Sequence, residues 1–397
     1  MATVPRLPRS VLSLRLRGML RLARDLAFKF ADWLILFVPA RGPRRGIAVI
    51  MPHGLGDLLL VTPAFRHIRA HFQGEPILLV CSASAQAYAV AYLQPDQILL
   101  LDRVSMRWNL RHRIRVLVAM ARAGARVALQ PNYHREHLIE DAVMRAARAD
   151  VSIGSWGSPI LITSRERACS DPWYSTLIHE PSELPHEADF YATFCEAVTG
   201  SRPPRILPKL LRPGLHPDVP KSDYVVVACE ASSVVKAWPA ERFLETARAI
   251  SARTGFAIVL VGEFASQSSG EQGMIDLRGA TDLTALISVL AHAKLVLCND
   301  SAPVHLAAAL GVQVVAVGGG GIPDRYLPYP TTEPHPAPPV LVTVDPAWAC
   351  FGCGWRCQYA VPAGQPLPCV TDVSPDQVLN ACLAVLHQPS RMRALPA

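Results

Sequence analysis

The stretch from Leu297 to Gly321, LCNDSAPVHLAAALGVQVVAVGGGG, restricts the fold of this chain more than any other feature. Its apolar run ending at Cys298 predicts a buried strand, and residues 303–310 predict a short helix with a proline in its first turn. Gly311 ends that helix, and the β-branched run 312–317 predicts a second buried strand. Such a strand–helix–strand unit places free N–H groups above a sheet edge, so the stretch predicts an anion site that suits a pyrophosphate.

Three polar residues join the first strand to the helix in this stretch: Asn299, Asp300 and Ser301. Oxygen side chains at such positions accept hydrogen bonds from the first N–H groups of a helix, so we expect them to cap it. The glycines at 318–321 follow the second strand, and we expect them to leave the backbone bare.

Apolar runs and helix-compatible stretches alternate along the rest of the chain. Strands are predicted at 46–51, 77–81, 98–101, 126–130, 151–153, 224–228 and 257–261, and helices at 185–199, 240–252, 283–291 and 375–387. A further helix follows the loop 52–57 and reaches about Phe72, with a restart at Thr62-Pro63 as an alternative. This regular order of two-sided apolar strands and helices predicts an α/β protein with parallel sheets covered by helices.

The composition of the segments predicts five regions. These are a basic N-terminal segment (1–45), a first α/β domain (46–200), a proline-rich linker (201–222), a second α/β domain (223–345), and a cysteine-rich segment with a final helix (346–397). Residues 323–346 are rich in proline and are predicted to be irregular. Two similar halves joined by a linker predict a cleft, and we expect Asp57 and Asp300, at strand carboxyl ends, to face it.

The net charge of +7 belongs to one end of the chain. Residues 1–45 contain ten Lys and Arg and two Asp, whereas the remainder contains 29 basic and 30 acidic residues. The globular part is therefore nearly neutral, and we expect no nucleic-acid partner.

The N-terminal segment has an apolar helical stripe over residues 12–30, with Arg17, Arg21, Arg24 and Lys29 on other faces. The apolar run 33–38 that follows is shorter than the ~18 to 20 residues that span a bilayer, and no secretory signal is evident. Two interpretations stay open. The helix is held on anionic lipid by its arginines, or it packs on the first domain with a solvated basic face.

Ten cysteines in a chain without an export signal predict reduced thiols. Four of them lie in apolar elements and are predicted to be core residues: Cys81, Cys195, Cys229 and Cys298. Four others have the spacing C-x2-C-x3-C-x11-C: Cys350, Cys353, Cys357 and Cys369. This cluster is either a thiolate metal site or a lid with reduced or adventitiously disulfide-bonded cysteines.

Asp57 follows the glycine loop formed by Gly54 and Gly56, directly after the first strand. It is predicted either to act as a general base at the carboxyl end of the strand or to cap the next helix. The dinucleotide-binding fingerprint is absent, because Leu59 stands where its third glycine would be.

Other candidate side chains lie after strands of the second domain. Lys236 would reach a diphosphate as a mobile cation, and Ser232 or Ser233 would bond the same oxygens. Glu263 would accept bonds from a ribose or base, and His305 would face the phosphates or pack against the sheet. The alternative for the lysine and the glutamate is a solvated position in a loop.

The ordered motifs together resemble glycosyltransferase family 9, the heptosyltransferase type, over residues 46–388. They are GLGD-x4-TP at 54–63, K-x-WP at 236–239, NDS-x-P-x-HLAAALG at 299–311, and the cysteine cluster followed by VSPDQV at 373–378. This resemblance implies a GT-B fold, with two Rossmann-like domains facing a central cleft. It also implies an inverting mechanism that needs no metal or other cofactor.

By position, the resemblance implies roles for individual residues. Asp57 matches the proposed general base, Lys236 the lysine at the donor diphosphate, and Asp300, Ser301, Ala302 and His305 the nucleotide-sugar segment. The sequence departs from the pattern at Ala302, where glycine is usual, and a methyl group there crowds the approach of a phosphate. Acceptor contacts are expected at 130–137, with Asn132, His134 and Arg135 as candidates.

The resemblance further implies transfer from ADP-heptose to an inner-core lipopolysaccharide acceptor. The partners would be a nucleotide-sugar donor and a lipid-linked glycan, and the enzyme would work at the cytoplasmic face of the inner membrane. Three alternatives remain: the same fold with another nucleotide sugar or acceptor, a nucleotide-sugar epimerase that acts without an acceptor, and a non-catalytic nucleotide-sugar-binding protein.

Overall fold

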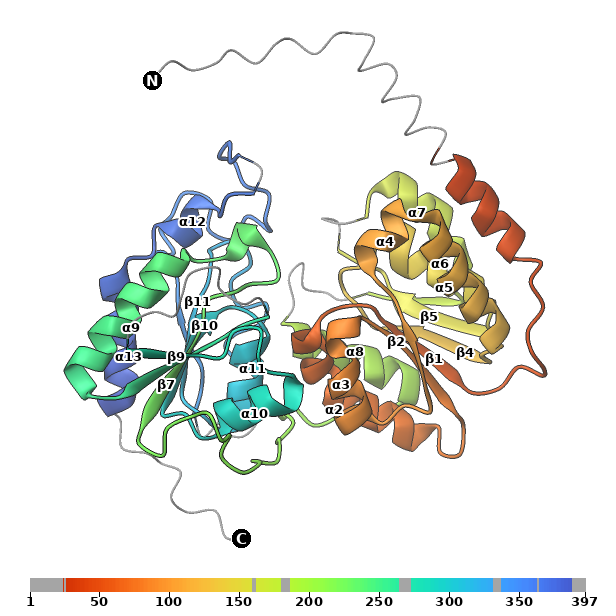
Figure 1. The fold of residues 1–397 in the computed structure, drawn as a ribbon. Coiled ribbons are helices and arrows are strands. Elements are labelled where there is room, and N and C mark those ends of the chain that lie inside the picture. Colours follow the sequence, from red (N-terminus) through yellow and green to blue (C-terminus); the bar gives the residue numbers. More distant parts are fainter. Residues whose placement is uncertain are drawn as a thin grey trace. The chain divides into compact units, whose positions relative to one another are not determined.

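This computed structural model describes residue 24 and residues 26–158, 162–179, 186–263, 273–330, 337–362 and 364–387. The chain divides into two compact units, each with its own sheet (Figure 1). Unit 1 comprises residues 1–52, 74–83 and 95–177, and unit 2 comprises residues 53–73, 84–94 and 178–397. The predicted boundaries of the two domains, 46–200 and 223–345, stay a prediction.

The sheet of unit 1 has the strand order β3-β2-β1-β4-β5-β6. Its strands are β1 (Ile47–Met51), β2 (Ile77–Cys81), β3 (Gln97–Leu100), β4 (Val127–Gln130), β5 (Val151–Ser155) and β6 (Thr176–Ile178). The central strand β1 pairs in parallel with β2 and β4. The helices are α4 (Arg103–Trp108), α5 (Leu110–Ala123), α6 (Ala142–Ala147) and α7 (Ser164–Ser170). The apolar faces of α4, α5 and α6 form one core with β1, β2 and β4.

Residues 26–35 form an additional helix that packs on unit 1. Phe28, Ala31 and Ile35 on its inner side are buried, and Ile35 belongs to the core of the unit. The predicted stripe over 12–30 lies largely outside the described residues. Among the described residues, every helix is too short or too polar to cross a lipid bilayer.

The sheet of unit 2 has the order β12-β11-β10-β7-β8-β9. When the strands of each unit are counted along the chain, both sheets have the same order, 3-2-1-4-5-6. Its strands are β7 (Tyr224–Ala228), β8 (Ala257–Val261), β9 (Met274–Asp276), β10 (Leu295–Asn299), β11 (Val314–Val317) and β12 (Val340–Val342). Its longer helices are α2 (Leu55–His71), α8 (Glu187–Thr199), α9 (Ala240–Thr254), α10 (Leu283–Ala291), α11 (Ala302–Ala309) and α13 (Pro375–His387), with short α3 (Gln86–Tyr88) and α12 (Pro368–Thr371). This doubly wound order places ligands at the carboxyl ends of the central strands.

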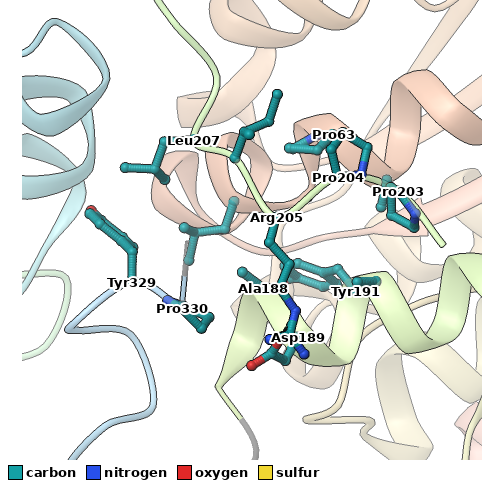
Figure 2. Close-up of a pocket in the computed structure, with 14 residues that line it drawn as sticks. Pro63, Ala188, Asp189, Tyr191, Pro203, Pro204, Arg205, Leu207, Tyr329 and Pro330 are labelled. Carbon is teal, nitrogen blue, oxygen red and sulfur yellow. Dashed lines mark ion pairs between the residues drawn. The ribbon is translucent and has the colours of Figure 1, made fainter. Parts of the chain in front are cut away.

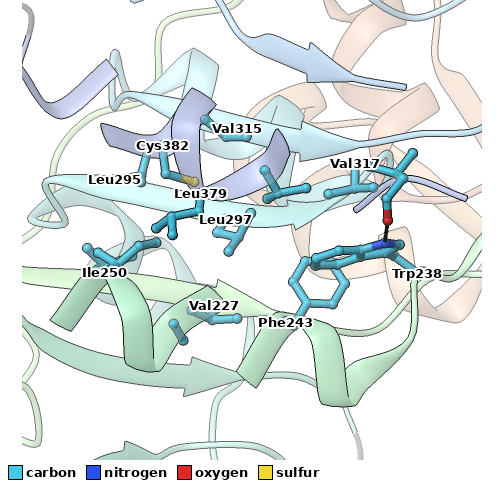
Figure 3. Close-up of a cluster of buried hydrophobic side chains, with 14 of the residues drawn as sticks. Val227, Trp238, Phe243, Ile250, Leu295, Leu297, Val315, Val317, Leu379 and Cys382 are labelled. Carbon is cyan, nitrogen blue, oxygen red and sulfur yellow. Dashed lines mark hydrogen bonds between the residues drawn. The ribbon is translucent and has the colours of Figure 1, made fainter. Parts of the chain in front are cut away.

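The core of unit 2 lies between its sheet and the helices α9 and α13 (Figure 3). Trp238 is 1% exposed and packs edge to face on Phe243, with ring centroids 4.8 Å apart. The indole Nε1 of Trp238 donates to the carbonyl oxygen of Val373, 2.9 Å away. This bond ties the loop after β7 to the C-terminal segment.

Most predicted elements are present, and the strands 77–81, 224–228 and 257–261 have the predicted bounds. The restart at Thr62-Pro63 was wrong, because α2 continues through Pro63. Its residues 58–62, 64, 65 and 68 are buried, and this packing outweighs the hydrogen bond lost at the proline. The region 323–346 is not wholly irregular, since it contains β12. The short strands β6 and β9 were not predicted.

Candidate functional site

Lys236 and Asp300 lie at the carboxyl ends of β7 and β10, the two central strands of unit 2. These strands pair in parallel, and the strand order reverses between them. The Nζ atom of Lys236 donates to the backbone carbonyl oxygen of Asp300, 3.2 Å away. The structure therefore brings these two predicted residues together at the switch point of a doubly wound sheet, where ligands of such sheets bind.

The residues before α11 do not cap it as predicted. Ser301 is at the N-cap position, but its hydroxyl donates to the carbonyl oxygen of Asn299, 3.2 Å away, and makes no bond to the helix start. The buried amide of Asn299 is bonded elsewhere. Its Oδ1 accepts from the N–H of Trp238, and its Nδ2 donates to the carbonyl oxygen of Cys229. Within the described part of the chain, no side chain caps the first N–H groups of α11, which begins at Ala302.

The first turn of α2 packs against the first turn of α11. A Cβ atom on Gly56 would lie 2.9 Å from Cδ2 of His305 and 3.9 Å from Cα of Ala302. At 2.9 Å the ring of His305 would have to shift, so a side chain at this position would disturb the packing of the two helix starts. The backbone of the glycine loop thus approaches the predicted phosphate segment closely.

Asp57 lies in the first turn of α2, and Gly54 occupies the N-cap position. The alternative in which Asp57 caps this helix is therefore wrong. Burial raises the pKa values of three groups of unit 2, and the Asp57 carboxylate adds to each rise: Glu187, Tyr191 and Tyr326. Asp57 is thus next to the start of α8 and to the loop that follows β11.

Glu187 and Arg325 form a buried ion pair beside Asp57. Arg325 is 0% exposed and Glu187 is 3% exposed. The N–H of Glu187 also donates to the carbonyl oxygen of Arg325, 2.8 Å away. Burial raises the pKa of Glu187 to about 7, the Arg325 guanidinium opposes this rise, and the Asp57 carboxylate adds to it. Three ionisable groups therefore share one region of low dielectric.

His305 is 4% exposed and packs among aromatic side chains. Its Nδ1 lies 2.8 Å from the hydroxyl of Tyr329, and Tyr326 contacts it edge to face. Burial lowers the pKa of His305 to about 3, and the positive charges of Lys236 and His186 add to this effect. The imidazole is therefore neutral at physiological pH and serves as a hydrogen-bonding group.

The carboxyl group of Asp300 has a raised pKa. Burial raises the pKa of its carboxyl group, and the charge of Lys236 lowers it.

The remaining donor-site candidates lie around the same end of the sheet. Ser232 and Ser233 are exposed in the loop after β7. Glu263 follows β8, and its N–H donates to a carboxylate oxygen of Glu230, 2.7 Å away. The N–H of Lys236 donates to the carbonyl oxygen of Ser233, 3.2 Å away, and the role of the two serine hydroxyls in binding a diphosphate stays a prediction.

The acceptor candidates lie in unit 1, after β4. Asn132 is 1% exposed, and its Nδ2 donates to the carbonyl oxygen of Ile50, 2.8 Å away. Arg135 is fully buried and pairs with Asp141 and Asp171. This arrangement gives Asn132 and Arg135 structural roles, whereas His134 is half-buried. A contact of these residues with an acceptor stays a prediction.

The glycines after β11 serve the packing of the cysteine-rich segment. Cβ atoms on Gly319, Gly320 and Gly321 would lie 2.6–2.8 Å from side chains at 351, 355 and 370. The prediction of a bare backbone is corrected, because this segment covers it.

All ten cysteines are free thiols. Among the described residues, which include all ten, no group of three or more potential ligands is placed to hold a metal ion.

A pocket of unit 2 lies between α2, α8 and the linker, with Tyr329 and Pro330 at one side (Figure 2). It holds ≈ 30 Å³, which is room for one or two water molecules. The ion pair of Arg205 and Asp189 lies at its rim, with 3.0 Å between Nε and Oδ1.

Sequence reasoning missed Glu187, Arg325, Tyr326 and Tyr329. A glutamate in the first turn of a predicted helix is typical of a stabilising charge at a helix start. The other three residues lie in a proline-rich stretch that has no periodicity. Their only signal was the presence of large side chains in a loop.

Comparisons with known proteins agree with this architecture. Residues 182–333 match the family model described as glycosyltransferase family 9 (heptosyltransferase). No curated protein sequence matches the chain. A family 9 glycosyl transferase from Veillonella parvula is 19% identical, with a TM-score of 0.60, and the match covers 88% of this chain and 99% of that chain.

Two Escherichia coli structures are also similar. ADP-heptose lps heptosyltransferase II is 16% identical, with a TM-score of 0.59, over 86% of this chain and 99% of that chain. Heptosyltransferase WaaC with ADP-2-deoxy-2-fluoro heptose is 17% identical, with a TM-score of 0.56, over 85% of this chain and 99% of that chain. At these identities the likeness shows the fold, and the predicted GT-B fold class is confirmed. The resemblance to glycosyltransferase family 9 is likewise confirmed over residues 182–333, and the protein is a glycosyltransferase.

Proposed function

We propose that the protein is an inverting transferase that moves a heptose from ADP-heptose to the inner core of a lipopolysaccharide acceptor. The observation that carries this proposal is the arrangement at the switch point of unit 2. There Lys236 and the uncapped start of α11 lie at the same sheet edge, and Gly56 brings the start of α2, with Asp57, against α11. A cation and free N–H groups suit the diphosphate of a nucleotide sugar.

The reaction is a single displacement at the anomeric carbon of the donor. The acceptor hydroxyl oxygen forms a bond to this carbon, and the bond from the carbon to the diphosphate oxygen breaks. Asp57 takes the proton of the acceptor hydroxyl, and ADP leaves with the bonding electron pair. Lys236 and the N–H groups of α11 stabilise the negative charge that develops on the leaving oxygen, so the step needs no divalent cation.

The neutral imidazole of His305 holds the start of α2 against α11 and is available to a phosphate oxygen through hydrogen bonding. Ser232, Ser233 and Asp300 complete the contacts to the donor. The buried pair of Glu187 and Arg325 keeps the surroundings of Asp57 in place.

Two E. coli neighbours support the choice of donor, since their names include ADP-heptose and an ADP-heptose analogue. A lipid-linked, anionic acceptor places the enzyme at the cytoplasmic face of the inner membrane. The basic N-terminal segment suits this location, because basic residues near a membrane are attracted to anionic lipids.

The test is the thermal stability of the purified protein with ADP, UDP, GDP or CMP. A ligand at ~100 times its dissociation constant adds ~2.7 kcal/mol to the stability of the folded state. We expect stabilisation by ADP alone. Stabilisation by another nucleotide would contradict the ADP-linked donor, and no stabilisation by any of the four would contradict the nucleotide-sugar site.

A further inference from the structure

The helix formed by residues 26–35 is fixed on unit 1 by its inner side. Phe28, Ala31 and Ile35 are buried, and the carboxylate of Asp32 accepts from Nε of Arg113, 2.7 Å away, and from its Nη2. The guanidinium of Arg113 also lies over the ring of Phe28, and Arg148 donates to two carbonyl groups that follow the helix. These contacts determine which side of the helix points outwards.

The outward side of this helix is apolar rather than basic. Four helix residues and Phe37 just after the helix recur three and four positions apart and are 46–67% exposed. They are Leu26, Phe30, Trp33, Leu34 and Phe37, here called the outer face. Phe30 stacks on Trp33 at 6.0 Å, and Trp33 meets Phe37 edge to face at 5.0 Å. A helix that only covered a domain would turn polar residues to water, so an aromatic face of this kind indicates a binding surface.

Positive charge surrounds the outer face. Lys29 is exposed on the same helix. The chain from Arg103 to Ala123, which packs below it, contains six arginines, of which Arg103, Arg107 and Arg113 are paired with carboxylates and the others are exposed. Arg111 and Arg115 of α5 are exposed, and Arg24 lies over the ring of Trp108 in α4, 4.3 Å from its centroid. Figure 1 shows this helix, in red, beside α4 and α5.

We propose that the outer face is a membrane-insertion surface, which enters the headgroup region of an anionic bilayer and is held there by the surrounding basic residues. Trp and Phe are favoured at the membrane interface, and Lys and Arg are attracted to anionic headgroups. A second copy of the chain fits less well, because it would bring the same positive charge against the first. The proposal rests on the proposed function in one respect, the membrane location of the acceptor.

The test measures binding of the full chain to vesicles of phosphatidylcholine alone and of phosphatidylcholine with phosphatidylglycerol. We expect binding to the anionic vesicles and quenching of tryptophan fluorescence by brominated acyl chains. The variant Phe30→Ser/Trp33→Ser/Phe37→Ser should lose about tenfold or more in binding, because three interfacial anchors are removed. The control Val90→Ser/Leu211→Ser removes exposed apolar side chains of unit 2 and should bind like the wild type.

Equal binding by the triple variant and the wild type would overturn the proposal. So would a wild-type dimer in solution that the triple variant does not form, because the outer face would then join two copies. Sugar transfer to a detergent-solubilised acceptor separates this proposal from the proposed function. Normal transfer without vesicle binding would overturn only the insertion surface, whereas vesicle binding without transfer would count only against the transferase assignment.

Discussion

Removal of one charge of the buried pair beside Asp57 should destabilise unit 2 strongly. Arg325 is fully buried, and its partner Glu187 is 3% exposed, so the variant Arg325→Met leaves the carboxyl group of Glu187 buried without its cationic partner. Breaking such a pair costs about 3–5 kcal/mol. This is a large part of the ~5–15 kcal/mol that stabilises a typical protein. Urea unfolding of the wild type and the variant measures the difference.

Two further variants make this measurement specific. Arg205→Met breaks the ion pair with Asp189 at the rim of the pocket, where the two side chains are 44% and 26% exposed, so it should cost at most about 1 kcal/mol. The double variant Glu187→Met/Arg325→Met removes both buried charges. Its free energy of unfolding should lie within about 1 kcal/mol of that of the wild type. A loss below 1 kcal/mol for Arg325→Met, or a double variant as unstable as the single one, would refute the reasoning.

Lys236→Met should weaken ADP binding by about 1.5–3 kcal/mol, the usual contribution of a charged hydrogen bond, as measured by titration calorimetry. Gly56→Ala should also weaken ADP binding, since the new methyl group would lie 2.9 Å from Cδ2 of His305 and displace the ring, whereas Gly54→Ala meets nothing closer than 3.9 Å. Glu187→Gln should change how stability depends on pH. In the wild type this carboxyl group, with its pKa raised from 4.5 to about 7, favours the folded state below pH 4.5, and about 3 kcal/mol of that contribution is lost as the pH rises to 7.

Each of these predictions has a contrary outcome. Lys294→Met is the control for Lys236, because Lys294 is 47% exposed and pairs with Asp223. Equal ADP affinities for the two lysine variants would contradict a diphosphate contact at Lys236. Equal effects of the two glycine variants would contradict the close approach to His305. Parallel pH profiles for Glu187→Gln and the wild type would contradict the raised pKa.

The sequence predicted the elements whose signal is local. Strand β7 is a continuous apolar run, and α11 is bounded by polar residues and by Gly311, so both are found close to their predicted positions. The short strands β6 and β9 lack such a signal, because three residues at a sheet edge carry no period. Pro63 was predicted to be a possible break, and the burial of α2 on both sides of it decided otherwise.

The candidate site was predictable only in part for a similar reason. Motif spacing identified Asp57, Lys236 and His305, because each follows a strand or begins a helix. The prediction that Asn299 caps α11 was wrong, because it was based on the residue type alone. In the structure its amide bonds instead to the backbone of Trp238 and Cys229 and joins two loops. Arg325 acquires its role only through contact with a residue 138 positions earlier in the chain, Glu187.

The N-terminal helix shows the same limit. The arginines at 17, 21 and 24 suggested a basic surface, either bound to lipid or solvated with the helix packed on the first domain, but the helix at 26–35 contains no arginine. The structure combines a packed inner side with an aromatic outer face, because Asp32 and Arg113 fix the rotation of the helix. Sequence periodicity alone does not determine that rotation when both sides are apolar.

The most direct test of the account is the rate of heptose transfer from ADP-heptose to a lipopolysaccharide acceptor by the wild type and by Asp57→Asn, with ADP binding measured on both proteins. We predict transfer by the wild type, a fall of ~10² to 10⁴ in the turnover of the variant, and unchanged ADP binding, because a positioned base contributes that much to the rate. Wild-type turnover by Asp57→Asn would contradict the role of Asp57, and the absence of transfer by the wild type would contradict the donor and acceptor.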